Sequence, residues 1–586
     1  MVKVFKIRRT PFKVWLGVII LVVAIVLMAV HTENYWNLFP LILPVLLVVD
    51  EQMTRILVQE NGDIWLKRGF SGSIKAYGVV RIVRRKGTLL KGRVTVYYTK
   101  GFVNFDPADL TEFLRCARGA IPTLFTARKS DCFTVKKCCM DFQLAIIGGG
   151  PAGYTAAERA GEKGISVVLF EKSSLGGVCL NEGCIPTKTL LYSAKVFDTV
   201  RNASKYAVAA GQHEVNLPKV ISRKAKVVRK LVLGIKSRLA ERHVEIVTGE
   251  ARIIDKNTVE CNGEIYRCQS MILATGSETV VPPIPGIESV AYWTHRDALE
   301  CKELPQSLVI VGGGVIGMEF ASFFNSLGVQ VTVVEMMDEI LRGIDREIAE
   351  MLRADYAKRG VRFLLQAKVT GLQADESGNM TVSYESQEGE GAVSAQKMLL
   401  SVGRRPVTKG FGLEALGLEL TERGRIKVDS HMETSVAGVY ACGDLNGVSL
   451  LAHTAVREAE VAVRHIMGES DAMSYRAIPS VVYTNPEVAS VGKDEETLRA
   501  EGVAYRAIKL PMAYSGRFVA ENEGVNGVCK VLVDEEDRLL GLHMLGNPSS
   551  ELIVLAGMMI EDGRRLSELK RYVFPHPTVG EIFREL

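Results

Sequence analysis

The stretch FQLAIIGGGPAGYTAAERAGEKG, residues 142–164, predicts the architecture of the region around it. Its apolar start is typical of a buried strand, and its alanine-rich end is typical of a helix. Gly148, Gly150 and Gly153 stand in the G-x-G-x-x-G register, which permits a tight turn and close approach of the backbone to a pyrophosphate at the helix N-terminus. The next apolar run, VVLF, ends at Glu171, where a carboxylate can accept a hydrogen bond from a ribose hydroxyl. These residues predict a βαβ unit that binds a nucleotide.

The pattern recurs in residues 307–335, SLVIVGGGVIGMEFASFFNSLGVQVTVVE. Here the glycines of the turn are Gly312, Gly314 and Gly317, and the second strand ends at Glu335. Two glycine turns in unrelated α/β units are the alternative interpretation, but strand, turn, helix and acid follow in the expected order both times. A protein that reads a 2′-phosphate would have Arg here, so Glu335 favours NAD over NADP. Two dinucleotides on one chain imply electron transfer between them, typically between FAD and a nicotinamide.

A pair of cysteines lies between the two units. In GGVCLNEGCIPTKTLL, residues 176–191, Cys179 and Cys184 are five positions apart, just before a helical run. One strained turn can close a disulfide at this spacing, and a helix start lowers the pKa of a thiol. Only 11 of the 586 residues are cysteine, too few for a disulfide scaffold, so a reducing compartment fits best. We therefore expect a redox-active pair; no metal site is predicted, and the adjacent Cys138 and Cys139 lack ligand spacing.

Residues 140–586 resemble the flavin disulfide oxidoreductases from end to end, and among these the dihydrolipoamide dehydrogenase family. Five motifs carry the resemblance: CLNEGCIPTK at 179–188, ATG at 274–276, TSVAGVYACGD at 434–444, IPSVVYTNPEVASVG at 478–492 and FPHPTVGE at 574–581. The first is closer to the C-L-N-x-G-C of that family than to the C-V-N-V-G-C of glutathione reductase or mercuric reductase. The resemblance implies an α/β fold with two Rossmann-like domains, for FAD and NAD, and an α+β dimerisation domain.

The resemblance also implies roles for individual residues. It makes Cys179 the thiol that exchanges with the substrate and Cys184 the thiolate against the flavin. It makes His576, held by Glu581, a base that acts across a homodimer; without the cysteines and Glu581, His576 would be read as an ordinary surface imidazole. Besides the two glycine turns with Glu171 and Glu335, the expected cofactor contacts are Lys188 and Glu319 as an ion pair near the flavin, Thr275, Gly276, and Asp444 on the ribityl chain.

The activity implied is NAD-dependent oxidation of dihydrolipoyl groups, with FAD as the intermediate carrier. The partner would be a dihydrolipoyl-carrying protein of a 2-oxo acid dehydrogenase or glycine-cleavage system. A related FAD disulfide reductase acting on another thiol or disulfide is the alternative. Mercuric reductase is disfavoured because the C-terminal EIFREL lacks paired cysteines, and glutathione reductase is disfavoured because it would prefer NADPH.

The first 139 residues differ in character from the rest. They contain 22 Lys/Arg and 9 Asp/Glu, against 50 and 58 in residues 140–586. Residues 14–30 are 17 uncharged residues, which would span about 25 Å as a helix, and residues 38–49 form a second apolar run. Lys and Arg flank both runs and are absent from the connector 31–37, so we expect a membrane hairpin with both ends in the cytoplasm. A cleaved signal peptide is the alternative interpretation.

The hairpin would place the enzyme at the inner membrane, facing the cytoplasm; without this segment attached, a soluble cytoplasmic enzyme is expected. Residues 53–105 read as short strands with glycine turns, and 107–118 as a closing helix, which resembles small bacterial membrane proteins with a pleckstrin-homology-like domain. The predicted division is 1–52 transmembrane hairpin, 53–118 small β-rich domain, 119–139 linker, 140–286 first part of the FAD domain with the redox pair, 287–404 NAD domain, 405–475 second part of the FAD domain, and 476–586 dimerisation domain.

Met140-Asp141 resembles the natural start of a complete dehydrogenase. We therefore expect the two halves to be separately functional, joined either by a true fusion or by mistaken joining of neighbouring reading frames. No motif predicts binding to nucleic acid.

Overall fold

The computed structural model describes residues 140–586, and in residues 1–139 it describes only the backbone of seven short strands. The chain divides into two compact units, residues 1–138 and 139–586. The expected membrane runs at 14–30 and 38–49, the closing helix and the linker lie outside the described residues. Within the part that is described, no helix is both long and apolar enough to cross a lipid bilayer.

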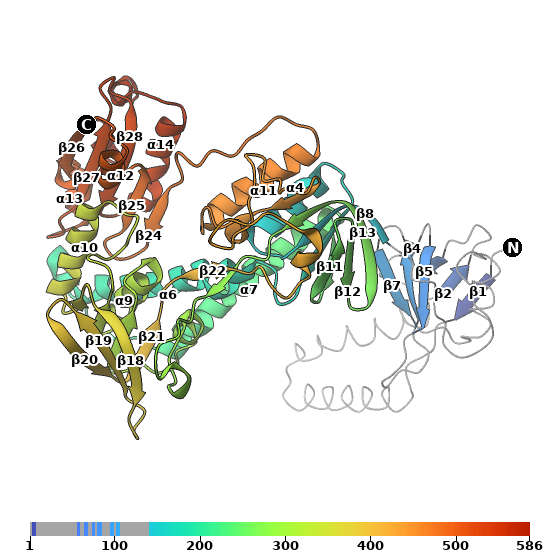
Figure 1. Ribbon diagram of the computed structural model, residues 1–586, viewed down its shortest axis with the longest axis horizontal. Helices are drawn as coiled ribbons and strands as arrows, with labels where there is room; N and C mark the ends of the chain where they lie inside the picture. Colours follow the sequence, from blue (N-terminus) through green and yellow to red (C-terminus); the bar gives the residue numbers. More distant parts are fainter. Residues whose placement is uncertain are drawn as a thin grey trace, which may run out of the picture. The chain divides into compact units, whose positions relative to one another are not determined.

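The strands of the first unit form two small antiparallel sheets (Figure 1). In sheet order they are β1 (Lys3–Lys6), β2 (Arg55–Val58), β3 (Ile64–Lys67) and β4 (Ser73–Ala76), then β5 (Val79–Arg84), β6 (Val94–Tyr98) and β7 (Gly101–Phe105). Short strands were expected between residues 53 and 105, and β2, β3, β5, β6 and β7 lie in apolar runs there. The sequence did not predict β1 and β4, which the structure identifies by their pairing with β2 and β3, respectively.

The first sheet of the second unit is mostly parallel. Its order is β10 (Glu245–Thr248), β9 (Val167–Glu171), β8 (Met140–Ile147), β13 (Glu264–Leu273), β12 (Thr258–Cys261) and β11 (Ala251–Asp255). On the free edge of β13, Met271–Leu273 pair in parallel with a late strand, β23 (Val439–Ala441). The antiparallel β12 pairs with the first residues of β13. One long strand thus joins a parallel layer to an antiparallel one.

Both faces of this sheet are covered, which is why residues 144–147 of β8 are continuously apolar rather than alternating. Leu144 and Ile146 pack into a core with the helices α4 (Pro151–Glu162), α7 (Leu217–Glu241) and α11 (Ala452–Ile466). Ala145 and Ile147 point to the other face, into a separate core that includes Phe411. Helices α4 and α11 lie side by side (Figure 1).

The second sheet repeats the parallel arrangement. Its order is β17 (Arg362–Leu364), β16 (Gln330–Val334), β15 (Ser307–Val311) and β21 (Lys397–Leu400). Leu308 and Ile310 pack into a core with α9 (Val315–Ser326) and α10 (Arg346–Lys358). Val309 and Val311 face an antiparallel sheet made of β18 (Lys368–Ala374), β19 (Met380–Ser386) and β20 (Gly389–Ala395). The two predicted βαβ units are therefore both present, each as a layer of a helix-covered sheet.

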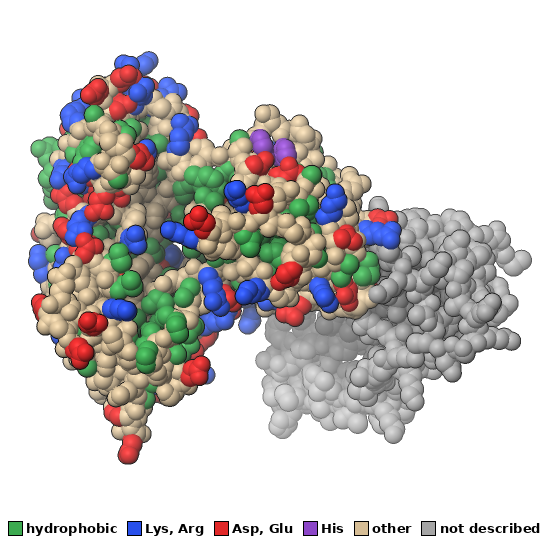
Figure 2. All heavy atoms as spheres, in the orientation of Figure 1, with side chains coloured by type: hydrophobic (Ala, Val, Ile, Leu, Met, Phe, Trp, Pro, Cys, Tyr) green, Lys and Arg blue, Asp and Glu red, His purple; other side chains and the backbone are tan. Residues whose placement is uncertain are grey.

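The third sheet is antiparallel. Its order is β24 (Ser480–Val482), β25 (Val488–Gly492), β28 (Leu539–Leu545), β27 (Val528–Val533) and β26 (Arg506–Pro511). Helix α14 (Ser549–Glu561) covers one face through Ile553 and Ala556. The other α-helices of this unit are α5 (Gly177–Glu182), the longer α6 (Cys184–Arg201), α8 (His295–Leu299), α12 (Glu495–Ala500) and α13 (Gly516–Glu521), and β14 (Ser277–Thr279) pairs with β22 (Arg404–Pro406) in a two-stranded ribbon. Acidic and basic side chains are interspersed over the visible face of this unit (Figure 2).

A buried ion cluster connects the third sheet to helix α10, which packs on the second sheet. Lys530, on β27, is 3% exposed, and its Nζ lies 2.8 Å from Oδ2 of Asp345, the residue that caps the N-terminus of α10. The same Nζ lies 3.1 Å from Oε2 of Glu347 and is also bonded to Glu495 at the start of α12. Hydrogen bonds from Lys530 and Tyr505 outweigh the effect of burial and lower the pKa of Glu495 to about 2. The cluster therefore favours the ionised form of Glu495.

Replacing Lys530 by methionine should destabilise the protein by about 3–5 kcal/mol, because it leaves buried carboxylates without a counter-charge. The measurement is denaturant unfolding of the full chain with FAD bound. The matched control is Lys509→Met, since Lys509 also pairs with Glu347 but is 46% exposed and should cost about 1 kcal/mol or less. Equal losses in the two variants would contradict a role for the buried cluster in stability.

Candidate active site

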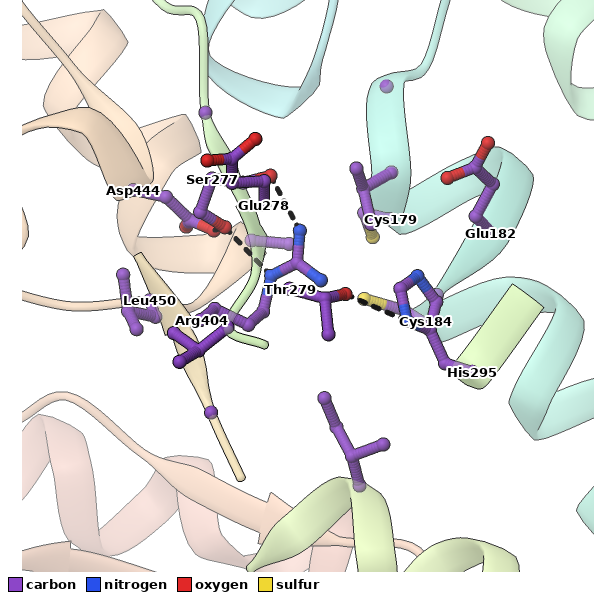
Figure 3. A pocket seen from close by; sticks show the side chains of 18 of the residues that line it. Cys179, Glu182, Cys184, Ser277, Glu278, Thr279, His295, Arg404, Asp444 and Leu450 are labelled. Carbon is purple, nitrogen blue, oxygen red and sulfur yellow. Dashed lines mark hydrogen bonds between the residues drawn. The ribbon is translucent and has the colours of Figure 1, made fainter. Parts of the chain in front are cut away.

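One cavity of about 2540 Å³ in the second unit is lined by most of the residues that the sequence singles out. Both glycine turns reach it, and so do both cysteines (Figure 3). The predicted residues that line it are Gly148, Gly150, Glu171, Cys179, Cys184, Lys188, Thr275, Gly276, Gly312, Gly314, Glu319, Glu335 and Asp444. The other four, Gly153, Gly317, His576 and Glu581, do not line it.

The first glycine of each turn allows a close approach between strands. Gly148 and Gly312 have φ angles of +106° and +105°, a region that disfavours side chains. A Cβ on Gly148 would lie 2.2 Å from the carbonyl oxygen of Ala274, and one on Gly312 would lie 2.5 Å from that of Ser401. Ala274 and Ser401 both follow the neighbouring parallel strand, so the same backbone contact is made twice.

In each turn, the second glycine of the motif faces the cavity and the third lies behind it. A Cβ on Gly314 would meet nothing within 4 Å, so the turn is open towards the cavity there. A Cβ on Gly153 or Gly317 would lie 1.7 or 2.0 Å from the carbonyl oxygen of the first glycine, so these two let the helix pack against the turn. With no side chain capping either helix N-terminus, each turn is a cradle that fits a pyrophosphate.

The acids at the strand ends brace these turns. Glu171 accepts hydrogen bonds from the backbone N–H groups of Gly149 and Ser173, at 2.8 and 2.7 Å. Glu335 accepts the equivalent bonds from Gly313 and Met337, at 2.6 and 2.8 Å. The sequence predicted a ribose contact for both acids, but it did not predict that each carboxylate also fixes the loop beside it.

The two cysteines face each other across the junction of two helices. Cys179 lies in α5 and Cys184 begins α6, and in this structure both are free thiols. A hydrogen bond from the Cys179 thiol, aided by the Lys188 ammonium and opposed by burial, lowers the pKa of Cys184 to about 7. The same bond, together with burial, raises the pKa of Cys179 far above its usual value. The environment therefore favours a thiolate at Cys184 and a neutral thiol at Cys179.

The predicted ion pair between Lys188 and Glu319 is present beside the cysteines. Nζ of Lys188 lies 2.8 Å from both carboxylate oxygens of Glu319, whose side chain is 4% exposed. Glu319 also accepts a hydrogen bond from the backbone N–H of Tyr483, at 3.1 Å, and Lys188 lies 4.6 Å from the centre of the Tyr483 ring. Two helices and one strand thus contribute to one charged group, since α6, α9 and the end of β24 each supply a residue.

Around Asp444 the structure shows a network that the sequence did not predict. Asp444 accepts a hydrogen bond from the hydroxyl of Ser277, which in turn accepts one from Nε of Arg404 at 2.7 Å (Figure 3). His295 lies in the same wall, with Nδ1 3.3 Å from the Thr279 hydroxyl, and burial followed by the charge of Arg404 lowers its pKa to about 4. The ATG motif ends one residue before Ser277, so the sequence could have indicated that Ser277 lies near the cofactor. It could not have indicated that the partners of Ser277 are Asp444 and Arg404.

His576 and Glu581 form a pair outside the cavity. Nδ1 of His576 lies 2.9 Å from Oε1 of Glu581, and the backbone N–H of Thr578 donates to Oε2 of the same carboxylate at 2.8 Å. A carboxylate can only accept, so in the neutral imidazole the proton is on Nδ1 and the free lone pair is on Nε2. The His576 side chain is 81% exposed. Within one subunit the pair therefore presents a base to its surroundings rather than to its own cysteines.

Comparison with known proteins agrees with this geometry. The family model described as pyridine nucleotide-disulphide oxidoreductase matches residues 142–459, and the model described as the dimerisation domain of the same family matches residues 478–586. The chain belongs to the pyridine nucleotide-disulphide oxidoreductase family. It is a flavoprotein disulfide oxidoreductase that uses FAD and NAD, and its dimerisation domain supports a homodimer.

The similar proteins cover the second unit of this oxidoreductase. The dihydrolipoyl dehydrogenase of Mycoplasma pneumoniae is 37% identical over 455 residues, 76% of this chain and 98% of that protein. The human mitochondrial dihydrolipoyl dehydrogenase is 36% identical over 460 residues, 76% of this chain and 90% of that protein. Among solved structures, the HOCl-induced flavoprotein disulfide reductase RclA of Escherichia coli has a TM-score of 0.68 at 30% identity, over 76% of this chain and 99% of that one.

Proposed function

We propose that this oxidoreductase is a dihydrolipoyl dehydrogenase, which oxidises protein-bound dihydrolipoyl groups and reduces NAD+ to NADH. The observation that carries the proposal is the pairing of Cys179 and Cys184 with opposite pKa shifts in one cavity with both nucleotide turns. The relatives that share nearly the whole of their length with this chain are named dihydrolipoyl dehydrogenases, which supports the same substrate here.

The proposed exchange begins with the Cys179–Cys184 pair as a disulfide. One substrate thiol loses its proton to His576 of the partner subunit and attacks the sulfur of Cys179, which breaks the disulfide and releases Cys184 as a thiolate. The second substrate thiol then attacks the mixed disulfide, so the substrate leaves as a cyclic disulfide and Cys179 becomes a thiol. Two electrons now reside on the cysteine pair, with the charge on Cys184.

The chain's own residues prepare the next transfer. Bound FAD supplies the two-electron carrier between the cysteines and NAD+. The Lys188 ammonium lies near enough to Cys184 to favour its thiolate, and Glu319 holds that ammonium in place. Asp444 and the first glycine turn would bind FAD at the first sheet. The second glycine turn would bind the nicotinamide nucleotide at the second sheet.

The test is a spectral and kinetic assay of the purified full-length chain. Visible absorbance should show bound FAD, and NADH should form when dihydrolipoamide and NAD+ are added together. Bound FAD without NADH formation would overturn the substrate proposal while leaving the family intact.

Neutralising Glu335 should weaken the preference for NAD. In Glu335→Gln the KM for NAD+ is expected to rise about tenfold, because the charged acceptor facing the ribose is lost, and the ratio of kcat/KM for NAD+ over NADP+ should fall by more than that. Steady-state kinetics with both nucleotides measure this. Asp338→Asn is the control, since Asp338 lies three positions further on, is 51% exposed, pairs with Arg346 and does not line the cavity. An unchanged ratio in Glu335→Gln would argue against the ribose contact.

A second candidate is a reductase for another oxidant. It is favoured by the likeness to RclA, which is an HOCl-induced flavoprotein disulfide reductase and has also been solved as a Cu(II) complex. NADH oxidation by small disulfides or by Cu(II), faster than NADH formation from dihydrolipoamide, would support this candidate instead.

We also propose that residues 14–49 anchor the chain to a membrane, on the basis of their apolar runs and flanking charges. The test is detergent-free fractionation of cells that express the full chain. Recovery of the intact chain in the soluble fraction would refute the anchor.

A further inference from the structure

Behind the loop that carries Asp444 lies a fully buried carboxylate. Glu458, on α11, is 0% exposed, and no step proposed above uses it. Its Oε2 accepts hydrogen bonds from the backbone N–H of Gly443 at 2.6 Å and from the Asn446 amide at 3.0 Å. Its Oε1 accepts one from the hydroxyl of Tyr475 at 2.7 Å. Three donors thus converge on one carboxylate, two of them from the residues on either side of Asp444 and Leu445.

The loop has little other freedom. Gly443 has a φ of +73°, and a Cβ there would meet Ala455 of α11 at 3.3 Å and Ala152 of α4 at 3.5 Å. The backbone of the Asp444 loop is therefore held between the helix of the first glycine turn and the helix that carries Glu458 (Figure 1). Ser277 donates a hydrogen bond to the Asp444 side chain itself (Figure 3). The bonds to Glu458 hold the loop on either side of Asp444, through the Gly443 backbone and the Asn446 side chain.

We propose that Glu458 is a positioning residue of the FAD site, which acts by holding the Gly443–Asn446 loop so that Asp444 faces the flavin. This rests on the proposed contact between Asp444 and the ribityl chain. A carboxylate suits the role because it accepts from all three donors at once. A glutamine could keep its oxygen on the Gly443 N–H and the Asn446 amide and turn its NH₂ group towards the Tyr475 hydroxyl, but it would bind the loop without the negative charge that strengthens both bonds.

The first test is FAD affinity of the full-length apoprotein, measured by quenching of flavin fluorescence. Glu458→Gln should raise the dissociation constant for FAD by about tenfold, as expected when the acceptor of the two loop bonds loses its charge. The control is Glu460→Gln on the same helix, because Glu460 is 25% exposed and pairs with Arg159 at the surface; its affinity should equal that of the wild type. An unchanged affinity in Glu458→Gln would overturn the proposal.

A double-mutant cycle separates positioning from general support of the fold. If Glu458 acts through Asp444, then Asp444→Asn combined with Glu458→Gln should lose no more affinity than Asp444→Asn alone. Additive losses would show that Glu458 only stabilises the domain and would overturn the proposal. If Asp444→Asn by itself leaves FAD affinity unchanged, the proposed flavin contact of Asp444 is wrong instead.

A milder variant covers the case in which Glu458→Gln does not fold. Tyr475→Phe removes the bond to Oε1 and a weak contact with the Met432 sulfur, but it keeps both bonds from the loop to Glu458. It should therefore weaken FAD binding less, and again non-additively with Asp444→Asn. An effect of Tyr475→Phe that simply adds to that of Asp444→Asn would contradict the inference.

The pH profile gives a readout that a purely structural role would not move. Burial raises the pKa of Glu458, opposed by the bonds from Tyr475, Gly443 and Asn446 and aided by the nearby charge of Asp444. A protonated Glu458 loses one acceptor, so FAD affinity of the wild type should fall as the pH is lowered, and Glu458→Gln should lack this component. The same pH profile in both proteins would overturn the proposal.

Discussion

Replacing Cys184 by serine is expected to lower NADH formation from dihydrolipoamide by more than about a thousandfold, while FAD stays bound. Serine cannot form the disulfide that receives the substrate's electrons, and it cannot carry a thiolate charge at neutral pH. The glycine turns and the Lys188–Glu319 pair do not depend on the sulfur, so the flavin absorbance should persist. The assay is steady-state NADH production by the purified full-length variant.

The matched control for this experiment is Cys301→Ser. Cys301 is buried and lies outside the cavity, and its thiol donates to the carbonyl oxygen of Glu303, which a hydroxyl can also do. Its activity should stay close to that of the wild type. NADH formation that survives in Cys184→Ser would show that electrons reach FAD without the cysteine pair.

Replacing His576 by glutamine should lower turnover by about a hundredfold or more, the usual contribution of a general base. The geometry adds a second expectation. His576 is exposed and does not line the cavity of its own subunit, so it should act on the cysteines of the partner. Refolded mixtures of Cys184→Ser and His576→Gln chains should then regain about a quarter of the wild-type activity, because half of the dimers are mixed and each holds one complete site.

This mixing experiment decides between two arrangements. If His576 served its own subunit, every site in a mixed dimer would lack either the cysteine pair or the base, and activity would stay at the level of the separate variants. No recovery, in mixtures shown to contain mixed dimers, would therefore contradict action across the homodimer.

Much of the candidate site could be predicted because its chemistry is encoded locally. Each glycine turn, with the strand before it and the acid after it, is contained within about 30 residues, and local patterns of this kind specify backbone geometry. The flavin disulfide oxidoreductase family and the cofactors FAD and NAD were predicted from the motifs and are confirmed by the comparisons, whereas the dihydrolipoyl substrate stays a prediction. The exchange chemistry assigned to individual residues stays a prediction until the variants are measured.

The parts that were missed depend on contacts between distant segments. Ser277 and Asp444 are 167 positions apart in the sequence. The role proposed for the Glu458 carboxylate depends on its hydrogen bonds to the loop before its own helix, which the sequence does not reveal. Lys530 reads in sequence as an ordinary charged residue of a strand, yet it is buried against Asp345, 185 positions earlier. A pattern search along the chain cannot weigh such contacts, because the burial and charge that define them arise only in the folded protein.

The late strand β23 has a consequence for how the protein is made. Its residues 439–441 complete the first sheet by pairing with residues 271–273, and the whole second sheet, residues 307–400, is translated between the two. On the ribosome the second sheet can close as soon as it has emerged, because domains tend to fold as units during synthesis. The first sheet must wait, open along one edge, until the strand, the Asp444 loop and α11 follow. The nicotinamide site is therefore expected to mature before the flavin site in every newly synthesised chain.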